Sequence, residues 1–142
     1  MSKERTKLSK QVTRDVRIQN PQAAIENAFT HFEDSLRKRI GGDYKLYSNN
    51  LIKAAYGKEE GRLLFIFDGK NSTEHLYYLM SGAYSLFRNP RHHKIIDDGE
   101  QKAQVIISLA ELLMEFVDAS EDRTTNLQNL SKVHAIDQKS LD

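Results

Sequence analysis

The sequence predicts a mainly all-α domain, and three observations lead to this fold class. Three segments, at 20–40, 73–88 and 99–119, repeat apolar residues at three- and four-residue spacing, which is the period of an amphipathic helix. Strand-like composition is confined to five residues, 63–67. The chain has 142 residues, of which 39% are hydrophobic, enough for one modest core. We therefore expect one small helical bundle with a short β-hairpin or strand near 63–67.

Residues 1–19 form a basic segment with few apolar side chains. Six lysines and arginines stand against Glu4 and Asp15, and the apolar residues are too sparse to anchor a core helix. We expect a flexible arm. Holding nucleic-acid phosphates is an alternative use of this arm, but short basic arms are common and the pattern is unspecific.

The first predicted helix starts at Asn20 and Pro21 and ends at Gly41. Asparagine is a favourable N-cap, and proline fits the first turn because its missing N–H would have no partner there. Glycine after the last turn is typical of a helix C-terminus. The apolar stripe consists of Ile25, Phe29, Phe32, Leu36 and Ile40. We expect the three cations at 37–39 to be solvated, near the negative end of the helix dipole.

A short helix is expected around 49–56, closed by Gly57, and the run LLFIF at 63–67 favours a strand. The turn sequence DGKN follows this run. Five residues do not separate a strand from a helix start by periodicity alone. The sequence offers no clear partner for the strand, except a short piece near 44–47.

The next predicted helix, 73–88, is expected to stop near Arg88. Pro90 cannot continue it and biases Asn89 away from helical geometry. Asn89 then becomes a cap for a new turn that starts at Pro90. Gly82 lies inside the helix, where it costs about 1 kcal/mol relative to alanine, and we expect it to admit a second backbone.

The last predicted helix, 99–119, is apolar around most of its circumference. Asp98, with Gln101 three residues later, is a capping signature for its start. A chain of this size seldom covers such a helix alone, so we expect one face to pack internally and another to meet a second copy across a two-fold axis. Residues 120–142 are polar and weakly patterned and are expected to form a weakly ordered tail.

The composition excludes several classes of protein. The absence of cysteine excludes disulfides, thiol nucleophiles and thiolate zinc sites, and it favours a reducing, cytoplasmic location. The N-terminus lacks the apolar core of a signal peptide, and no segment is apolar enough to span a membrane. The formal net charge is only +1, so binding of nucleic acid has to come from a local patch.

One local cationic cluster lies in the stretch SLFRNPRHHKIIDD, residues 85–98. Its basic residues are Arg88, Arg91, His92, His93 and Lys94. Arginine offers a planar, always charged fork for phosphate, and histidine titrates near neutral pH, so together they suit RNA cleavage without a metal. The structural alternative is a polar corner, because Asn-Pro is ordinary turn chemistry and cations at helix ends satisfy carbonyls.

Within this cluster, Arg88, Asn89 and His93 match the R-N-x-x-x-H form of the motif R-x(4–6)-H. This motif is that of the HEPN superfamily, small helical domains that include many metal-independent endoribonucleases of toxin–antitoxin and phage-defence systems. More narrowly, residues 50–117, with NNLIKAAYG at their start and LMSGAYSLFRNPRHHKIIDDGEQKAQVIISLAELL further on, resemble the C-terminal region of the bacterial Ymh family.

The resemblance implies a HEPN-like helical domain over 20–119 and a metal-independent endoribonuclease of toxin or phage-defence type. Arg88 would bind phosphate, Asn89 would orient the site, and His93 would transfer a proton. No metal and no cofactor is expected. The remaining cations of the cluster are candidate RNA phosphate ligands, namely Arg91, His92 and Lys94.

RNA is thus the expected substrate, with a homodimer formed through 99–119 and an antitoxin or a defence complex as a further partner. The alternative is a non-catalytic HEPN-type module that binds a partner protein or a nucleotide. His92 departs from the Ymh pattern, where the residue is often small, and so it stays open which of His92 and His93 faces the site. A metal site of these histidines with Asp97 and Asp98 is disfavoured, because adjacent histidines diverge.

Overall fold

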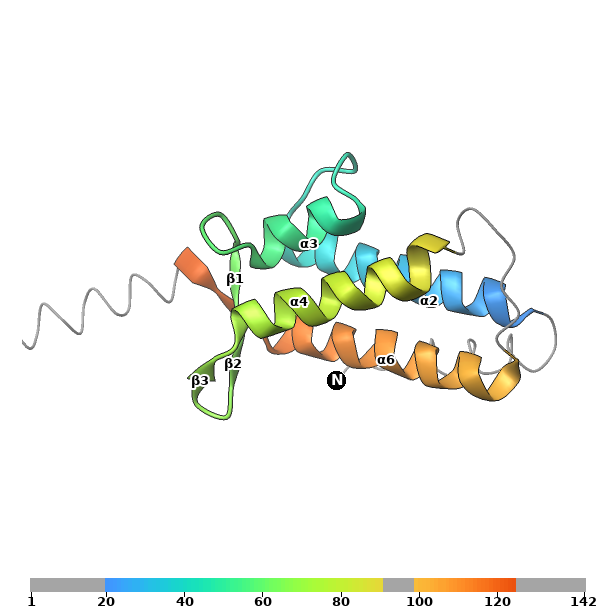
Figure 1. Ribbon diagram of the computed structural model, residues 1–142. Helices are drawn as coiled ribbons and strands as arrows, with labels where there is room; N and C mark the ends of the chain where they lie inside the picture. Colours follow the sequence, from blue (N-terminus) through green and yellow to red (C-terminus); the bar gives the residue numbers. More distant parts are fainter. Residues whose placement is uncertain (1–19, 91–98, 125–142) are drawn as a thin grey trace, which may run out of the picture.

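The computed structural model describes residues 20–90 and 99–124, which form a helical bundle (Figure 1). The long helices α2 (Pro21–Ile40) and α6 (Glu100–Ala119) pack along each other, and the short α3 (Ser48–Tyr56) packs against α2 and α4 (Thr73–Ala83). Helix α4 continues into a π-helical turn, η1 (Tyr84–Arg88), that contacts both α2 and α3. The predicted mainly-α fold class is confirmed.

Helix α2 begins and ends where the sequence predicts. Asn20 Oδ1 accepts a hydrogen bond of 3.0 Å from the backbone N–H of Gln22, and Pro21 occupies the first helical position. At the other end, Gly41 adopts a left-handed conformation with φ 64°. The N–H groups of the two glycines at 41 and 42 return to the carbonyls of Lys38 and Arg37.

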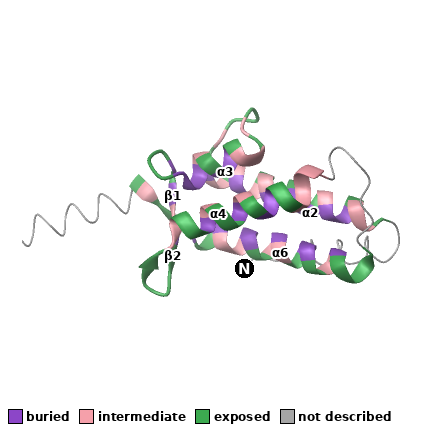
Figure 2. Cartoon of the chain, viewed as in Figure 1, coloured by how far each residue is buried: buried purple, intermediate pink, exposed green. Residues whose placement is uncertain are grey.

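The hydrophobic core lies between α2 and α6, with α3 and α4 closing its sides. All five residues of the predicted α2 stripe are buried. Figure 2 shows buried residues of α6 along the side turned towards the rest of the bundle, where α6 packs on α2. The largest fully buried side chains of the two long helices are Ile25, Phe29, Phe32, Leu36, Leu113 and Val117. This core fixes α2 relative to the rest of the bundle.

The basic end of α2 is less solvated than its sequence predicts, which corrects the expectation for the cations at 37–39. Arg37 donates from Nε and Nη2 to the carbonyl oxygen of Leu46, at 3.2 and 2.9 Å. Arg39 donates from Nη2 to the Ser120 carbonyl oxygen at 2.9 Å. Lys38 alone of the three is exposed. The two arginines tie distant backbone segments to α2 because the guanidinium offers several donors in fixed directions.

The run at 63–67 forms strands, but with partners that differ from the expected one. Strand β2 (Ile66–Phe67) pairs with β3 (Lys70–Asn71) in a hairpin whose turn places Asp68 and Gly69 at positive φ. Strand β1 (Leu63–Leu64) pairs antiparallel with β4 (Glu121–Asp122), and not with 44–47. The predicted tail at 120–142 is described only as far as residue 124, so its weak order stays a prediction.

Helix α6 starts one residue later than expected. Its N-cap position is Gly99, with φ 74°, in place of Asp98, which lies outside the described residues. One face of α6 is buried, as expected, and an apolar stripe on another face is left partly open: Val105, Leu109, Leu112 and Phe116. Val105 is 67% exposed and Leu112 is 41% exposed. Among the described helices, none is long and apolar enough to cross a membrane.

Candidate functional site

Arg88 is the last residue of the π-helical turn η1, and the helix does not stop there as predicted. Asn89 has φ −61° and ψ −44°, so it is helical, and its N–H donates to the Tyr84 carbonyl five residues earlier. In an α-helix the ring of Pro90 would press on the carbonyl four residues before it. A wider turn relieves this clash, and π-turns of this kind are frequent at functional sites.

A polar cluster lies where η1 packs against α2, and we call its members, Glu33, Arg37, Tyr84 and Arg88, the Glu33 cluster. The Tyr84 hydroxyl donates a hydrogen bond to Glu33 Oε1. Arg37 Nη2 lies 3.5 Å from Glu33 Oε2, and Arg37 Nη1 lies 2.9 Å from Asp34 Oδ1. Arg88 is half-buried, with its Nε atom buried. The cluster therefore places the Tyr84 hydroxyl and the Arg37 guanidinium on the Glu33 carboxylate, with Arg88 on the adjacent turn.

The electrostatics of the Glu33 cluster centre on the Glu33 carboxyl. Burial raises the pKa of this group above its ordinary value of 4.5, while the charges of Arg37 and Arg88 lower it in part. The carboxylate and Arg88 thus interact in a partly dehydrated environment, where a charge pair is stronger than in water. The charge of Arg88 therefore acts on Glu33 where η1 packs on α2.

A comparison of the sequence with models of known protein families shows the family to which the chain belongs. The family model described as "Protein of unknown function (Hypoth_ymh)" matches residues 4–117, which is most of the chain. The chain belongs to the Ymh family. The matched range runs from the basic N-terminal segment to near the end of α6, and it includes the Arg88 motif. No curated protein and no solved structure matches the chain.

The Ymh motif residues are described only in part. Arg88 and Asn89 lie at the end of η1, whereas Arg91, His92, His93 and Lys94 lie outside the described residues. The geometry of the arginine–histidine pair therefore stays a prediction. His31 and His75 lie at polar helix positions, where a surface histidine is the default, and both are exposed. Within 20–90 and 99–124, no group of three or more histidine or acidic side chains is arranged to hold a metal ion.

Three features of the region around Arg88 could not be predicted from the sequence. Tyr84 lies four residues before Arg88, and its helical spacing indicates a core or interface aromatic without revealing that its hydroxyl reaches Glu33. Glu33 is 55 residues before Arg88, and no local pattern links the two positions. The π-turn itself has one signal in the sequence, the proline two residues after Arg88. A proline usually ends a helix, so this signal predicted a helix end instead of a wider turn.

The other side of η1 is anchored to α3. Asn49 Nδ2 donates a hydrogen bond of 3.2 Å to Ser85 Oγ, next to Tyr84 in the chain. The ring of Tyr84 also packs edge-on against Phe29, with centroids 6.1 Å apart. Contacts on two sides hold the turn in place, so Arg88 lies at the end of a fixed element and not on a free loop end.

Proposed function

We propose that this Ymh protein is a metal-independent endoribonuclease of toxin or phage-defence type that acts as a homodimer. The observation that carries the proposal is the position of Arg88 at the end of a fixed π-turn, beside Glu33 and five residues before His93. A half-buried guanidinium at the end of a fixed turn is suited to a phosphate that gains charge during reaction. The resemblance to R-x(4–6)-H endoribonucleases supports the same conclusion.

In the proposed reaction, a histidine acts first as a general base. His93 withdraws the proton of the RNA 2′-hydroxyl, and the 2′-oxygen attacks the adjacent phosphorus while the bond to the 5′-oxygen breaks. Arg88 stabilises the charge on the phosphoryl oxygens. The products are a 2′,3′-cyclic phosphate and a 5′-hydroxyl, whose oxygen takes a proton from a general acid.

A dimer supplies both proton-transfer groups. One chain offers one arginine–histidine motif, whereas two chains related by a two-fold axis bring two histidines to a shared cleft, one as base and one as acid. The apolar stripe of α6 supports this arrangement. Its residues are spaced by four, three and four positions, as in the contact seam of paired helices. The stripe begins near the start of α6, and only residues 89–99 separate this helix from Arg88 in the sequence.

The proposal is tested by incubating RNA with the protein in EDTA and identifying the ends that form. Wild type is expected to yield 2′,3′-cyclic phosphates, and Arg88→Ala and His93→Ala are expected to lose most of the activity, about 10²-fold or more for a proton-transfer group. His31→Ala is the matched control, because His31 is an exposed histidine elsewhere on α2. Cleavage that survives in both motif variants, or that requires a metal, overturns the mechanism.

A second candidate function, a non-catalytic HEPN-type module, is favoured by the same Glu33 cluster. Glu33 already opposes the charge of Arg88, so the arginine also has a structural use in joining η1 to α2. In that case Arg88→Ala would lower the stability of the fold, and wild type would form a complex with a partner protein or a nucleotide without cleaving RNA. Unfolding curves recorded beside the cleavage assay separate the two functions.

A further inference from the structure

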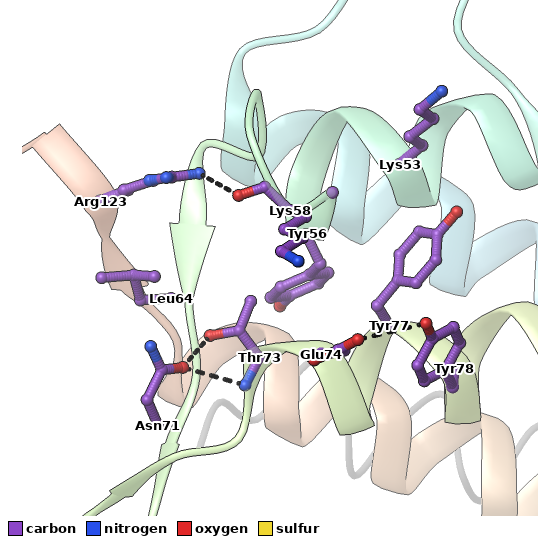
Figure 3. Close-up of a pocket in the computed structure, with 11 residues that line it drawn as sticks. Lys53, Tyr56, Lys58, Leu64, Asn71, Thr73, Glu74, Tyr77, Tyr78 and Arg123 are labelled. Carbon is purple, nitrogen blue, oxygen red and sulfur yellow. Dashed lines mark hydrogen bonds between the residues drawn. The ribbon is translucent and has the colours of Figure 1, made fainter.

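A pocket lies at the end of α4 opposite to Arg88, and no proposed catalytic residue lines it. It is formed by the C-terminal half of α3 and the loop after it, by β1, by the first turns of α4, and by Arg123 after β4 (Figure 3). We call it the α3–α4 pocket. Its volume of about 470 Å³ falls in the range of about 300–1,000 Å³ that small-molecule sites have.

The charged side chains around the α3–α4 pocket are mostly basic. Lys53, Lys58 and Arg123 contribute three positive charges, against one negative charge from Glu74. The Glu74 carboxylate also accepts a hydrogen bond of 3.2 Å from the Tyr78 hydroxyl. Because the chain as a whole is nearly neutral, this lining is a local cationic concentration, and it favours an anionic ligand.

Arg123 is held in place at the rim of the pocket. Its backbone N–H donates to the Arg62 carbonyl at 2.9 Å, and its Nη1 atom donates to the carbonyls of Lys58 and Gly61 at 3.2 and 3.4 Å. Among the bonds of the described residues, both side-chain bonds of Arg123 leave through Nη1. A guanidinium has five N–H donors in a planar fork, which suits an anion such as phosphate.

The pocket also has an aromatic wall. Tyr77 rises from α4 towards α3, with Lys53 beyond it on α3, and the buried Tyr56 forms part of the inner lining (Figure 3). The ring of Tyr77 is half-buried and the Tyr56 hydroxyl is engaged by Ser120 Oγ at 2.7 Å, so both rings have fixed positions. Aromatic faces of this kind stack on nucleobases with little preference for the base.

We propose that the α3–α4 pocket binds a nucleoside phosphate, with the base against Tyr77 and the phosphate on the side of Lys58 and Arg123, while Lys53 beyond Tyr77 adds positive charge to the same face (Figure 3). The combination of ring and cations favours this ligand over a simple anion, which needs no aromatic wall. The ligand is either one unit of an RNA strand or a free nucleotide. Tyr77 lies eleven residues before Arg88 on the same continuous helix, about 16 Å at 1.5 Å per residue. An RNA strand that reaches from the α3–α4 pocket to Arg88 therefore spans only a few nucleotides. The assignment of the ligand to an RNA strand rests on the proposed ribonuclease function.

The test measures binding without cleavage, so that its failure is distinct from failure of the ribonuclease proposal. Calorimetry compares three probes: a short 2′-O-methyl RNA that lacks the attacking hydroxyl, adenosine monophosphate, and an abasic oligonucleotide of the same length. Tyr77→Leu is expected to weaken binding of the RNA about fivefold or more, while leaving the weaker abasic probe unaffected. Lys53→Gln is expected to lower the slope of log affinity against log salt by about 0.7 for the RNA.

Tyr44→Leu and Lys45→Gln are the matched controls, because both residues are exposed and lie outside the pocket. Neither control should change binding, and circular dichroism checks that each variant is folded. Affinity for the monophosphate equal to that for the RNA assigns the pocket to a free nucleotide, and a much higher affinity for the RNA assigns it to a strand. The proposal is overturned if wild type binds neither ligand, or if Tyr77→Leu and Lys53→Gln bind both as wild type does.

Discussion

Tyr84 and Glu33 meet where η1 packs on α2, and the Tyr84 hydroxyl donates a hydrogen bond to Oε1 of Glu33. The two residues are 51 positions apart in the chain. Arg37 approaches the other carboxylate oxygen of Glu33, so both oxygens have a partner. Through this contact α2 orients the turn that carries Arg88, and the properties of Glu33 bear on both the stability and the geometry of the candidate site.

The variant Tyr84→Phe removes this hydrogen bond and little else. Phenylalanine preserves the edge-on packing against Phe29, but the half-buried Glu33 loses one donor. A hydrogen bond to a charged group contributes about 1.5–3 kcal/mol, and the Arg37 contact retains part of it. We expect the free energy of unfolding to fall by about 1–2 kcal/mol, as measured by urea denaturation at pH 7.

Tyr78→Phe is the control for that measurement, because the Tyr78 hydroxyl also donates to a glutamate, Glu74, four residues before it. Tyr78 is exposed, so water replaces the lost bond and we expect a change within about 0.5 kcal/mol. Equal effects of the two substitutions would show that the Glu33 contact is no stronger than a surface pair.

The stability of the protein should depend on pH through Glu33. Burial raises the folded-state pKa of this carboxyl above its ordinary value, so the folded state binds the proton more tightly than the unfolded state does. The resulting stabilisation is fully present below the ordinary pKa of 4.5 and is lost as pH rises through the folded-state pKa. Glutamine has no such titration.

We therefore expect the variant Glu33→Gln to gain stability relative to wild type as the pH rises from about 4 to 7. The attraction of Glu33 to Arg37 and Arg88 exists only when the carboxyl is ionised, so it is already part of the folded-state pKa and of this slope. Any difference between the two proteins that is the same at every pH carries no information on the titration, so only the slope is compared. Urea denaturation of both proteins at several pH values measures it. A slope of the opposite sign would mean that the two arginines outweigh burial and hold the pKa of Glu33 below its ordinary value.

Much of the fold followed from local sequence signals, and the site followed only in part. Asn20 and Gly41 mark the ends of α2 through caps that act within a few residues, and the spacing of the stripe identified its buried face. The pairing of Leu63 with Asp122 and the contact of Glu33 with Tyr84 depend on tertiary proximity. No local pattern encodes such contacts, so a single sequence does not reveal them.

Pro90 illustrates how a correct local rule gave a wrong boundary. Proline removes one N–H and crowds the preceding carbonyl, which usually ends a helix. Here the chain widens by one residue per turn over 84–88 and continues, because contacts of Tyr84 and Ser85 with α2 and α3 stabilise the wider turn. The packing of the whole domain thus overrode the preference of one residue.

Gly82 was expected to admit a second backbone, but the space beside it is open, and this predicts that alanine is tolerated there. A Cβ atom added at Gly82 would meet nothing within 4 Å, so this glycine does not admit a second backbone. It is exposed and helical, and alanine is favoured over glycine there by about 0.5–1 kcal/mol. We expect Gly82→Ala to raise the free energy of unfolding by this amount and the melting temperature by a few degrees.

Gly57→Ala is the control for Gly82→Ala, because we expect it to change the melting temperature, measured by calorimetry, in the opposite direction. A Cβ atom at Gly57 would lie 2.5 Å from the backbone oxygen of Lys53, so the end of α3 would have to shift. We expect a lower melting temperature for this variant. A melting temperature of Gly82→Ala below that of wild type would indicate that the flexibility of glycine is needed before the π-turn.

The apolar stripe of α6 makes the dimer testable by one substitution. If the stripe is the contact between two copies, Leu112→Glu places a charge from each chain in an apolar interface close to the two-fold axis, where neither charge has a partner. We expect wild type to have the mass of two chains in light scattering and the variant to have the mass of one. Leu79→Glu is the matched control, since Leu79 is 45% exposed on α4 and Leu112 is 41% exposed on α6.

RNA cleavage should fall with dimerisation in Leu112→Glu and stay at the wild-type level in Leu79→Glu, because the proposed site takes its base and its acid from different chains. A wild-type monomer that cleaves RNA would refute the shared site while leaving the role of Arg88 intact.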